Sequence, residues 1–176
     1  MSGHNKWSQI KEKKGKTDAY KSKIFGRLAR LITVETKKAA GNKEAPGLKS
    51  AVEKARAENM PNDNIERAIK KASDASSSSL ENITYEAYGP GGVAIIIEAL
   101  TDNKNKAVQE IKTVLAKNGT SLSSPGSAMW AFKKTGNVFE PVTTTKVEEN
   151  DAPALEKLID ELDNCDEVQE VFTNAE

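Results

Sequence analysis

The sequence predicts an α+β protein in which a small basic three-helix N-terminal domain precedes a ferredoxin-like βαββαβ domain. Three observations lead to this prediction. Apolar residues recur at helical spacing before Lys71, a serine-rich stretch then interrupts the chain, and short apolar strands alternate with amphipathic helices after it. We expect a basic helical domain with an N-terminal arm at 1–72, a Ser-rich linker at 73–82 and an acidic domain at 83–176.

The first domain is expected to contain one long helix and two short ones. Residues 18–40 form the long helix, which Gly41 can end. Its apolar stripe follows helical spacing and consists of Ile24, Leu28, Leu31 and Ile32. A second helix follows the break at Pro46-Gly47, and a third starts at a capping box of the D-x-x-E form at 63–66. A domain of this size has a thin core, so most of its surface must be polar.

The second domain is expected to alternate strands with helices. The expected elements are strands at 83–88 and 93–100, a helix at 104–118, strands at 127–133 and 138–147, a helix at 152–164 and a strand at 167–173. The glycine-rich stretch 89–92 leads into a strand and lacks the Gly-Lys-Ser/Thr of a P-loop, so we interpret it as a turn. Trp130 and Phe132 share a strand face, but the stacking pattern of an RNA-recognition motif is absent, which favours a place in the core for both.

The two halves of the chain carry opposite charges that cancel in the formal net charge of +0. Residues 1–71 contain 18 Lys and Arg against 8 Asp and Glu, whereas residues 72–176 contain 8 against 18. A polyanion is attracted to the first half and repelled by the second, which predicts that the N-terminal domain holds a nucleic acid. The alternative is that the basic domain pairs with its acidic neighbour within the chain.

The residue inventory disfavours an enzyme. His4 is the only histidine and Cys165 the only cysteine, so a Ser-His-Asp or Cys-His site and a zinc site of several Cys and His have too few candidates. We expect no catalytic residue, no metal, no cofactor and no small-molecule substrate. The longest apolar run, at 93–97, is too short to span a membrane, and the first residues lack the apolar segment of a secretory signal. A single cysteine fits a reducing compartment, so we expect a cytoplasmic protein without a membrane partner.

The candidate nucleic-acid-binding residues lie on the N-terminal arm and on the first long helix. They are Lys6, Trp7, Lys11, Lys13, Lys14, Lys16, Lys21, Lys23, Arg27, Arg30 and Lys37. Lysine and arginine neutralise phosphates, and an aromatic ring such as that of Trp7 can stack on a base, although for Trp7 alone we favour packing into the helical core. Arg27 and Arg30 lie beside the apolar stripe, so we expect both on the surface.

Several segments, in order along the chain, resemble the YebC/PmpR family. They are Ser2-Gly3-His4-Asn5-Lys6-Trp7-Ser8, Lys23-Ile24-Phe25, Asn59-Met60-Pro61-Asn62-Asp63-Asn64-Ile65-Glu66-Arg67-Ala68-Ile69, Tyr85-Glu86-Ala87-Tyr88-Gly89-Pro90-Gly91-Gly92-Val93-Ala94, Leu100-Thr101-Asp102-Asn103-Lys104-Asn105 and Val171-Phe172-Thr173-Asn174-Ala175-Glu176. The resemblance implies a helical domain, a ferredoxin-like domain and a third α/β domain usually inserted into the second. Only a short turn separates Lys134 from Val142 here, so this chain is expected to be a short form without that insertion.

The resemblance also implies a role in gene expression. Members of the family are described as DNA-binding transcriptional regulators, and others, including the mitochondrial translational activator of cytochrome c oxidase subunit I, resemble ribosome-associated factors that relieve stalling at sequences such as proline runs. Rows of Lys and Arg contact the nucleic-acid backbone more than the bases, which favours a partner of fixed shape such as ribosomal RNA, with DNA kept as an alternative. A different hypothesis is that the chain is a protein-interaction or ligand-sensing module that acts through the ferredoxin-like domain.

Overall fold

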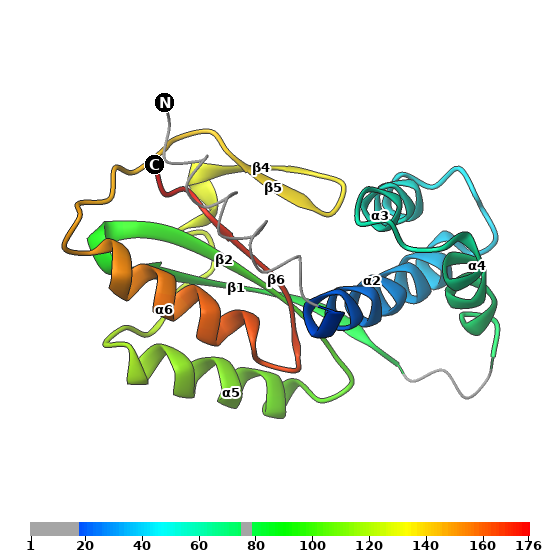
Figure 1. Ribbon diagram of the computed structural model, residues 1–176, viewed down its shortest axis with the longest axis horizontal. Coiled ribbons are helices and arrows are strands. Elements are labelled where there is room, and N and C mark those ends of the chain that lie inside the picture. The colour runs from blue at the N-terminus through cyan, green and yellow to red at the C-terminus, as the bar shows by residue number, and fades with distance from the viewer. Residues whose placement is uncertain (1–17, 75–78) are drawn as a thin grey trace. The chain divides into compact units, whose positions relative to one another are not determined.

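The computed structural model describes residues 18–74 and 79–176, which divide into two compact units (Figure 1). We call residues 18–74 with 79–80 the helical unit and residues 81–176 the α/β unit. The expected linker at 73–82 lies partly outside the described residues. Its last two residues already belong to the first strand, so the sheet begins earlier than the composition of the linker predicts.

The helices of the helical unit lie close to the positions that the apolar spacing predicts. They are α2 (Asp18–Ala39), α3 (Pro46–Ala57) and α4 (Asn62–Lys71). Their shared core is made of small and medium apolar side chains: Leu28, Leu31, Ile32, Leu48, Ala51, Ala55, Met60, Ile65 and Ala68. Because α3 and α4 are short, isolated helices of their length would be marginal, and packing on the long α2 must supply their stability.

The helix ends differ from the predicted ones in two places. Pro46 occupies the first turn of α3 instead of breaking the chain before it, because proline fits a position whose N–H has no intrahelical partner. At the other end of α3, Asn59 adopts a left-handed conformation (φ 61°) and the Met60 N–H reaches the Ala55 carbonyl at 2.9 Å, which is the Schellman pattern. Helix α4 starts directly after Pro61, without the side-chain cap that the D-x-x-E pattern at 63–66 predicts.

Two polar side chains of α2 hold the other helices. Glu35 is buried, and its Oε1 lies 3.0 Å from Lys38 Nζ. Its Oε2 approaches the first turn of α3 so closely that a Cβ added to Gly47 would lie 2.1 Å from it. A carboxylate at that place interacts favourably with the helix N-terminus, where Ala45 offers no side-chain cap. Thr33, also buried, places its hydroxyl 3.1 Å from the Ala68 carbonyl of α4.

The α/β unit contains a four-stranded antiparallel sheet in the order β3-β1-β2-β6 and a separate two-stranded sheet of β4 and β5. Its strands are β1 (Glu81–Gly89), β2 (Val93–Thr101), β3 (Leu122–Ser123), β4 (Phe132–Thr135), β5 (Val138–Pro141) and β6 (Val168–Thr173), and its helices are α5 (Lys104–Lys117) and α6 (Ala152–Asp163). Strands β1 and β2 form a hairpin through a 3-10 turn in which Gly91 and Gly92 have positive φ, so the glycine-rich stretch is a turn, as the sequence predicts.

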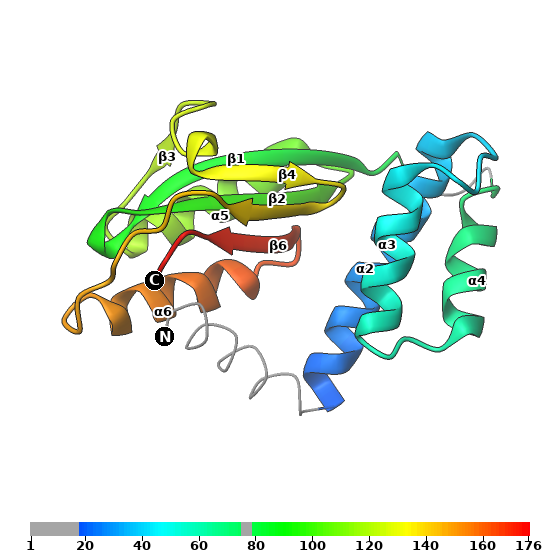
Figure 2. The same ribbon diagram turned by 90° about the horizontal axis from the view of Figure 1, so that it is seen from above.

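Strand β2 is covered on both faces, and all nine of its residues are buried. Helices α5 and α6 lie side by side on one face of the sheet, and the β4–β5 hairpin covers the other (Figures 1 and 2). On the helical side Gly89 leaves room for Ile95 and Leu155, whose methyl groups would lie about 3 Å from an added Cβ. The core on the hairpin side consists of Ala94, Ile96, Ala128, Ala131, Phe132, Phe139 and Phe172.

The mixed helix-and-sheet class is confirmed, but the strand order departs from a simple βαββαβ series. The strand at 81–89 pairs with β2 at the centre of the sheet, and the strand expected at 127–133 is a 3-10 turn followed by β4, which lies outside the main sheet. Phe132 is buried as expected, whereas Trp130 is 59% exposed. Among the described helices, none has both the length and the apolar character that a membrane span requires.

The segment after β6 is fixed by one buried asparagine. Asn174 Oδ1 accepts a hydrogen bond from the Ala94 N–H at 2.8 Å, and its Nδ2 donates to the Thr143 carbonyl at 3.0 Å. A buried amide that satisfies its donors and acceptors in this way joins β2, the segment after β5 and the last residues of the chain.

Replacement of Glu35 by Gln is expected to destabilise the helical unit by about 1 kcal/mol, because it removes a negative charge from the first turn of α3. Glu44→Gln is the matched control, since it breaks an exposed ion pair with Lys49 and should cost less than about 0.5 kcal/mol. Native-state hydrogen exchange of the α3 amides measures the loss of stability in each of the two variants. Equal effects of the two changes would show that Glu35 does not stabilise α3.

Candidate nucleic-acid interface

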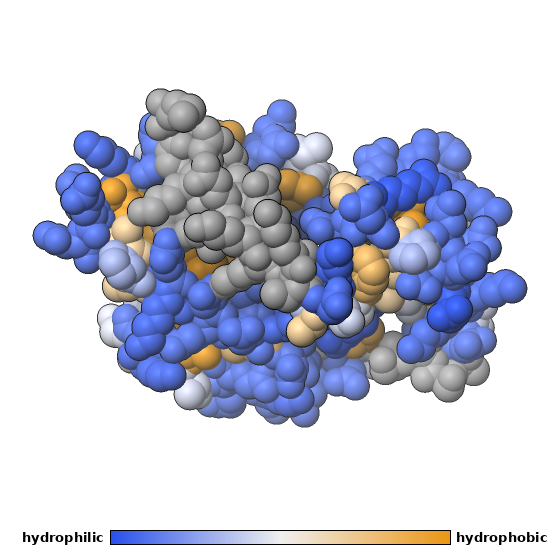
Figure 3. Space-filling view, viewed as in Figure 1, coloured by the Kyte–Doolittle hydropathy of each residue, from blue (hydrophilic) through white to orange (hydrophobic). Residues whose placement is uncertain are grey.

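The charge separation seen in the sequence follows the two structural units. In the part of the chain that the structure describes, the helical unit contains 13 Lys and Arg against 8 Asp and Glu, and the α/β unit contains 8 against 17. The face of the helical unit shown in Figure 3 is mostly hydrophilic. The excess of positive charge therefore lies on the unit with the smaller core.

The structure tests only part of the predicted set of binding residues. Lys6, Trp7, Lys11, Lys13, Lys14 and Lys16 lie outside the described residues. The five others are on α2, where Lys21 and Lys37 are exposed and Lys23 and Arg30 are half-buried.

Arg27, the fifth, is only 6% exposed, so the expectation that it lies on the surface is wrong. The buried part of α2 is wider than one apolar stripe. It includes Arg27, Leu31 and Val34, which follow one another at helical spacing beside Leu28 and Ile32. A buried side chain is poorly placed to meet a phosphate, and we remove Arg27 from the interface.

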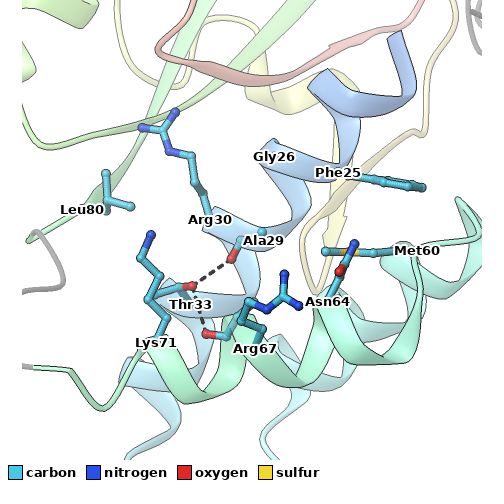
Figure 4. Close-up of a pocket in the computed structure, with 11 residues that line it drawn as sticks. Phe25, Gly26, Ala29, Arg30, Thr33, Met60, Asn64, Arg67, Lys71 and Leu80 are labelled. Atoms are coloured by element: carbon cyan, nitrogen blue, oxygen red, sulfur yellow. Dashed lines mark hydrogen bonds between the residues drawn. The ribbon is translucent and has the colours of Figure 1, made fainter. Parts of the chain in front are cut away.

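A pocket of about 440 Å³ lies between α2 and α4 (Figure 4). Its lining residues are Phe25, Gly26, Ala29, Arg30, Thr33, Met60, Asn64, Arg67, Ala68, Lys71 and Leu80. Three of them are cationic, and none is an acid, a histidine or a cysteine. The close-up shows Phe25 and Met60 at one end, Arg30 and Lys71 at the other, and Arg67 between them. Such a lining can bind an anion that carries an apolar or aromatic part, and it offers no carboxylate or imidazole for acid–base chemistry.

Helical spacing brings these residues together. On α2 the lining positions 25, 26, 29, 30 and 33 share one face, and on α4 so do 64, 67, 68 and 71. Sequence reasoning found Arg30 but missed Arg67 and Lys71. The i, i+4 spacing of Arg67 and Lys71, with Asn64 three residues before Arg67, was the signal available for them.

The cations of the helical unit differ in how far acids neutralise them. Lys38 pairs with Glu35, and Lys49 pairs with Glu44, whose hydrogen bond and negative charge raise the pKa of the lysine. In contrast, no acid within the described ranges forms an ion pair with Arg67, Lys70 or Lys71, all of which are exposed. These charges at the end of α4 are therefore available to an external anion. Across residues 18–74 and 79–176, no three His, Cys, Asp or Glu side chains gather as a set of metal ligands.

Family models match almost the whole chain. The model of the TACO1/YebC protein N-terminal domain matches residues 5–75, and that of the TACO1/YebC second and third domain matches residues 80–140 and 136–175. Among solved structures, a conserved hypothetical protein from Aquifex aeolicus has a TM-score of 0.75 and 28% sequence identity over 90% of this chain and 91% of that chain.

Curated relatives share the name "Probable transcriptional regulatory protein". The relative from Finegoldia magna is 54% identical over 77% of this chain and 57% of its own length, and that from Rubrobacter xylanophilus is 46% identical over 89% and 64%. The relative from Fervidobacterium nodosum is 37% identical over 99% of this chain and 93% of its own length. The chain thus spans less than two thirds of the length of the first two of these relatives.

The comparisons also locate an internal difference in length. The alignment with the Fervidobacterium protein runs over 235 positions, whereas this chain has 176 residues, so at least 59 positions have no residue here. The model of the second and third domain matches in two stretches, 80–140 and 136–175, which overlap in the β4–β5 hairpin. The divided match and the missing positions agree with the expectation that this is a short form.

Acylation of Lys49 tests whether this lysine pairs with Glu44 in solution. The raised pKa of Lys49 leaves less of its amine neutral at pH 9, and only the neutral amine is acylated, so Glu44→Gln should make Lys49 react faster. Labelling with an acetyl ester followed by peptide mass spectrometry gives the rate of Lys49 in the unchanged protein and in the variant. Equal rates in the two proteins would contradict the ion pair.

Proposed function

The chain belongs to the TACO1/YebC family, and on that premise we propose that it is a non-enzymatic regulator of gene expression that binds nucleic acid through its helical unit. The observation that carries the proposal is the group of cations on α2 and α4: Arg30, Arg67 and Lys71 line one pocket, and no acid lies among its described lining residues. The α/β unit, with 17 acidic residues against 8 basic ones, would repel the same ligand. The names of the relatives support regulation, and the charge supports a polyanion as the partner.

We propose folded RNA, and ribosomal RNA in particular, as the partner. Lysine and arginine on helix surfaces hold phosphates at fixed positions and read little of the base sequence. A partner with a rigid phosphate framework suits such contacts better than a promoter, which is recognised through base edges. The resemblance to ribosome-associated factors then suggests a cytoplasmic protein that relieves stalling, for example at proline runs. DNA-directed transcriptional regulation, the role in the names of the relatives, is the alternative within the same proposal.

One observation favours a second function, a protein-interaction role for the α/β unit. Trp130 is 59% exposed and Val142 is 60% exposed, and a hydrogen bond of 2.8 Å from the Val142 N–H to the Ala131 carbonyl places them near each other. The Trp130 indole N–H lies 2.9 Å from the Tyr88 hydroxyl, which fixes the ring at the surface. Exposed tryptophan is typical of energetically important positions in protein interfaces.

Salt dependence distinguishes the two functions. If about six phosphates are neutralised, log K for the full chain on a structured RNA should fall with log salt with a slope of roughly −4 to −5. Changing Arg67 and Lys71 together to Gln should make this slope shallower by about 1.5, since each contact contributes roughly 0.7 to 0.9.

The matched control removes two positive charges from the other unit. Lys104→Gln with Lys117→Gln should leave the slope unchanged, because both lysines already pair with acids, Glu81 at 2.7 Å and Glu161 at 3.1 Å. A slope near zero in the unchanged protein would overturn nucleic-acid binding and leave the protein-interaction role. An equal change in both double variants would mean that only net charge matters and that α4 is not the contact.

A further inference from the structure

We propose that the pocket between α2 and α4 takes a single unpaired nucleotide of a folded RNA. Its phosphate would lie at the end lined by Arg30 and Lys71, its base would lie against Phe25 and Met60, and Arg67 would lie between the two. The inference rests on the proposed function and adds what the pocket recognises. Surface lysines alone can hold a phosphate without any cavity, whereas this site combines cations and an aromatic ring with a partly open pocket.

Gly26 is the first observation that points to a ligand. Glycine in the middle of a long helix is unfavourable, and a packing reason for one would be a close neighbour that leaves no room for a Cβ. No such neighbour exists here, since a Cβ on Gly26 would meet no described atom within 4 Å. The missing side chain instead leaves the backbone of α2 open to the pocket, so that a flat group can approach it closely.

The second observation is the division of the lining into two chemical ends. Cations are needed for a phosphate, whereas the half-buried Phe25 ring can stack on a base, and the buried Met60 lines the pocket beside it (Figure 4). The Asn64 side chain, which also lines the pocket, supplies both a donor and an acceptor for a base edge. A volume of about 440 Å³ is within the range of about 300–1,000 Å³ that small-molecule sites occupy.

The floor of the pocket is held in place by the packing of α2 against α4. The Thr33 hydroxyl lies 2.9 Å from the Ala29 carbonyl and 3.1 Å from the Ala68 carbonyl, and all three residues line the pocket. Thr33 and Ala68 are buried, which leaves little freedom for the distance between α2 and α4 at this point. A site that exists before the ligand arrives loses less conformational entropy on binding.

An unpaired nucleotide fits this site better than a paired one. A base inside a duplex presents only its edge, whereas a nucleotide in a loop or bulge can turn out and stack on a side chain. The charge at one end and the ring at the other also suit one nucleotide, because its phosphate and base are joined through a single sugar.

The test uses the full chain and two RNA hairpins of equal length, one fully paired and one with a single bulged adenosine. The unchanged protein should bind the bulged hairpin about tenfold more tightly, in keeping with the effect of one stacked base. Gly26→Leu fills the pocket and should abolish this preference, while the paired hairpin is bound as before. Gly26→Ala is the control, because alanine and leucine both favour the helix over glycine. The alanine methyl group is too small to fill the pocket, so the preference for the bulged hairpin should remain.

A charge control completes the test. Arg67→Gln should reduce the preference for the bulged hairpin, whereas Arg56→Gln removes the same charge from an exposed position of α3 outside the pocket and should preserve it. Circular dichroism confirms that each variant is folded. Equal binding of the two hairpins by the unchanged protein, or a preference that survives Gly26→Leu, overturns the pocket assignment while nucleic-acid binding stands. Failure to bind either hairpin at low salt overturns the proposed function itself.

Discussion

The helical unit depends on one constraint: two short helices must be held by a single long one. Helix α2 meets this constraint with an apolar stripe and with two polar contacts at neighbouring positions, Glu35 at the first turn of α3 and Thr33 at the Ala68 carbonyl of α4. Because the contact at Thr33 sets the distance between α2 and α4, the small residues Gly26 and Ala29 leave a pocket beside it that larger side chains would fill. The same packing that stabilises the unit therefore shapes its candidate binding site.

A thin core also explains why the charge can be so unevenly distributed. The helical unit buries few large side chains, so much of its surface is polar, and among the described residues that surface carries more Lys and Arg than Asp and Glu. The α/β unit buries a complete strand, β2, between two layers and can carry its acidic residues outside that core. The pocket of the helical unit is lined by residues of that unit alone and involves none of the acidic α/β unit.

Regular spacing made much of the fold predictable. The stripe of α2, the buried run of β2 and the glycine turn at 91–92 follow from local patterns, and the structure has them where they were expected. The path of the strands was less predictable, because 127–133 has strand-like composition but turns through a 3-10 helix before β4. In the site, Arg30 was found and Arg67 and Lys71 were missed, because their convergence depends on how α4 packs on α2. Arg27 was misplaced for a related reason: periodicity gives the direction of a buried face but not its width.

Ultraviolet crosslinking of the full chain in cells, with identification of both the crosslinked peptides and the bound nucleic acid, tests the central claim most directly. The account predicts crosslinks to structured RNA from peptides of α2 and α4, with Phe25 and Met60 among the modified residues because aromatic and sulfur-containing side chains near a base react readily. Crosslinks confined to the α/β unit, or a bound fraction of promoter DNA without RNA, would contradict it.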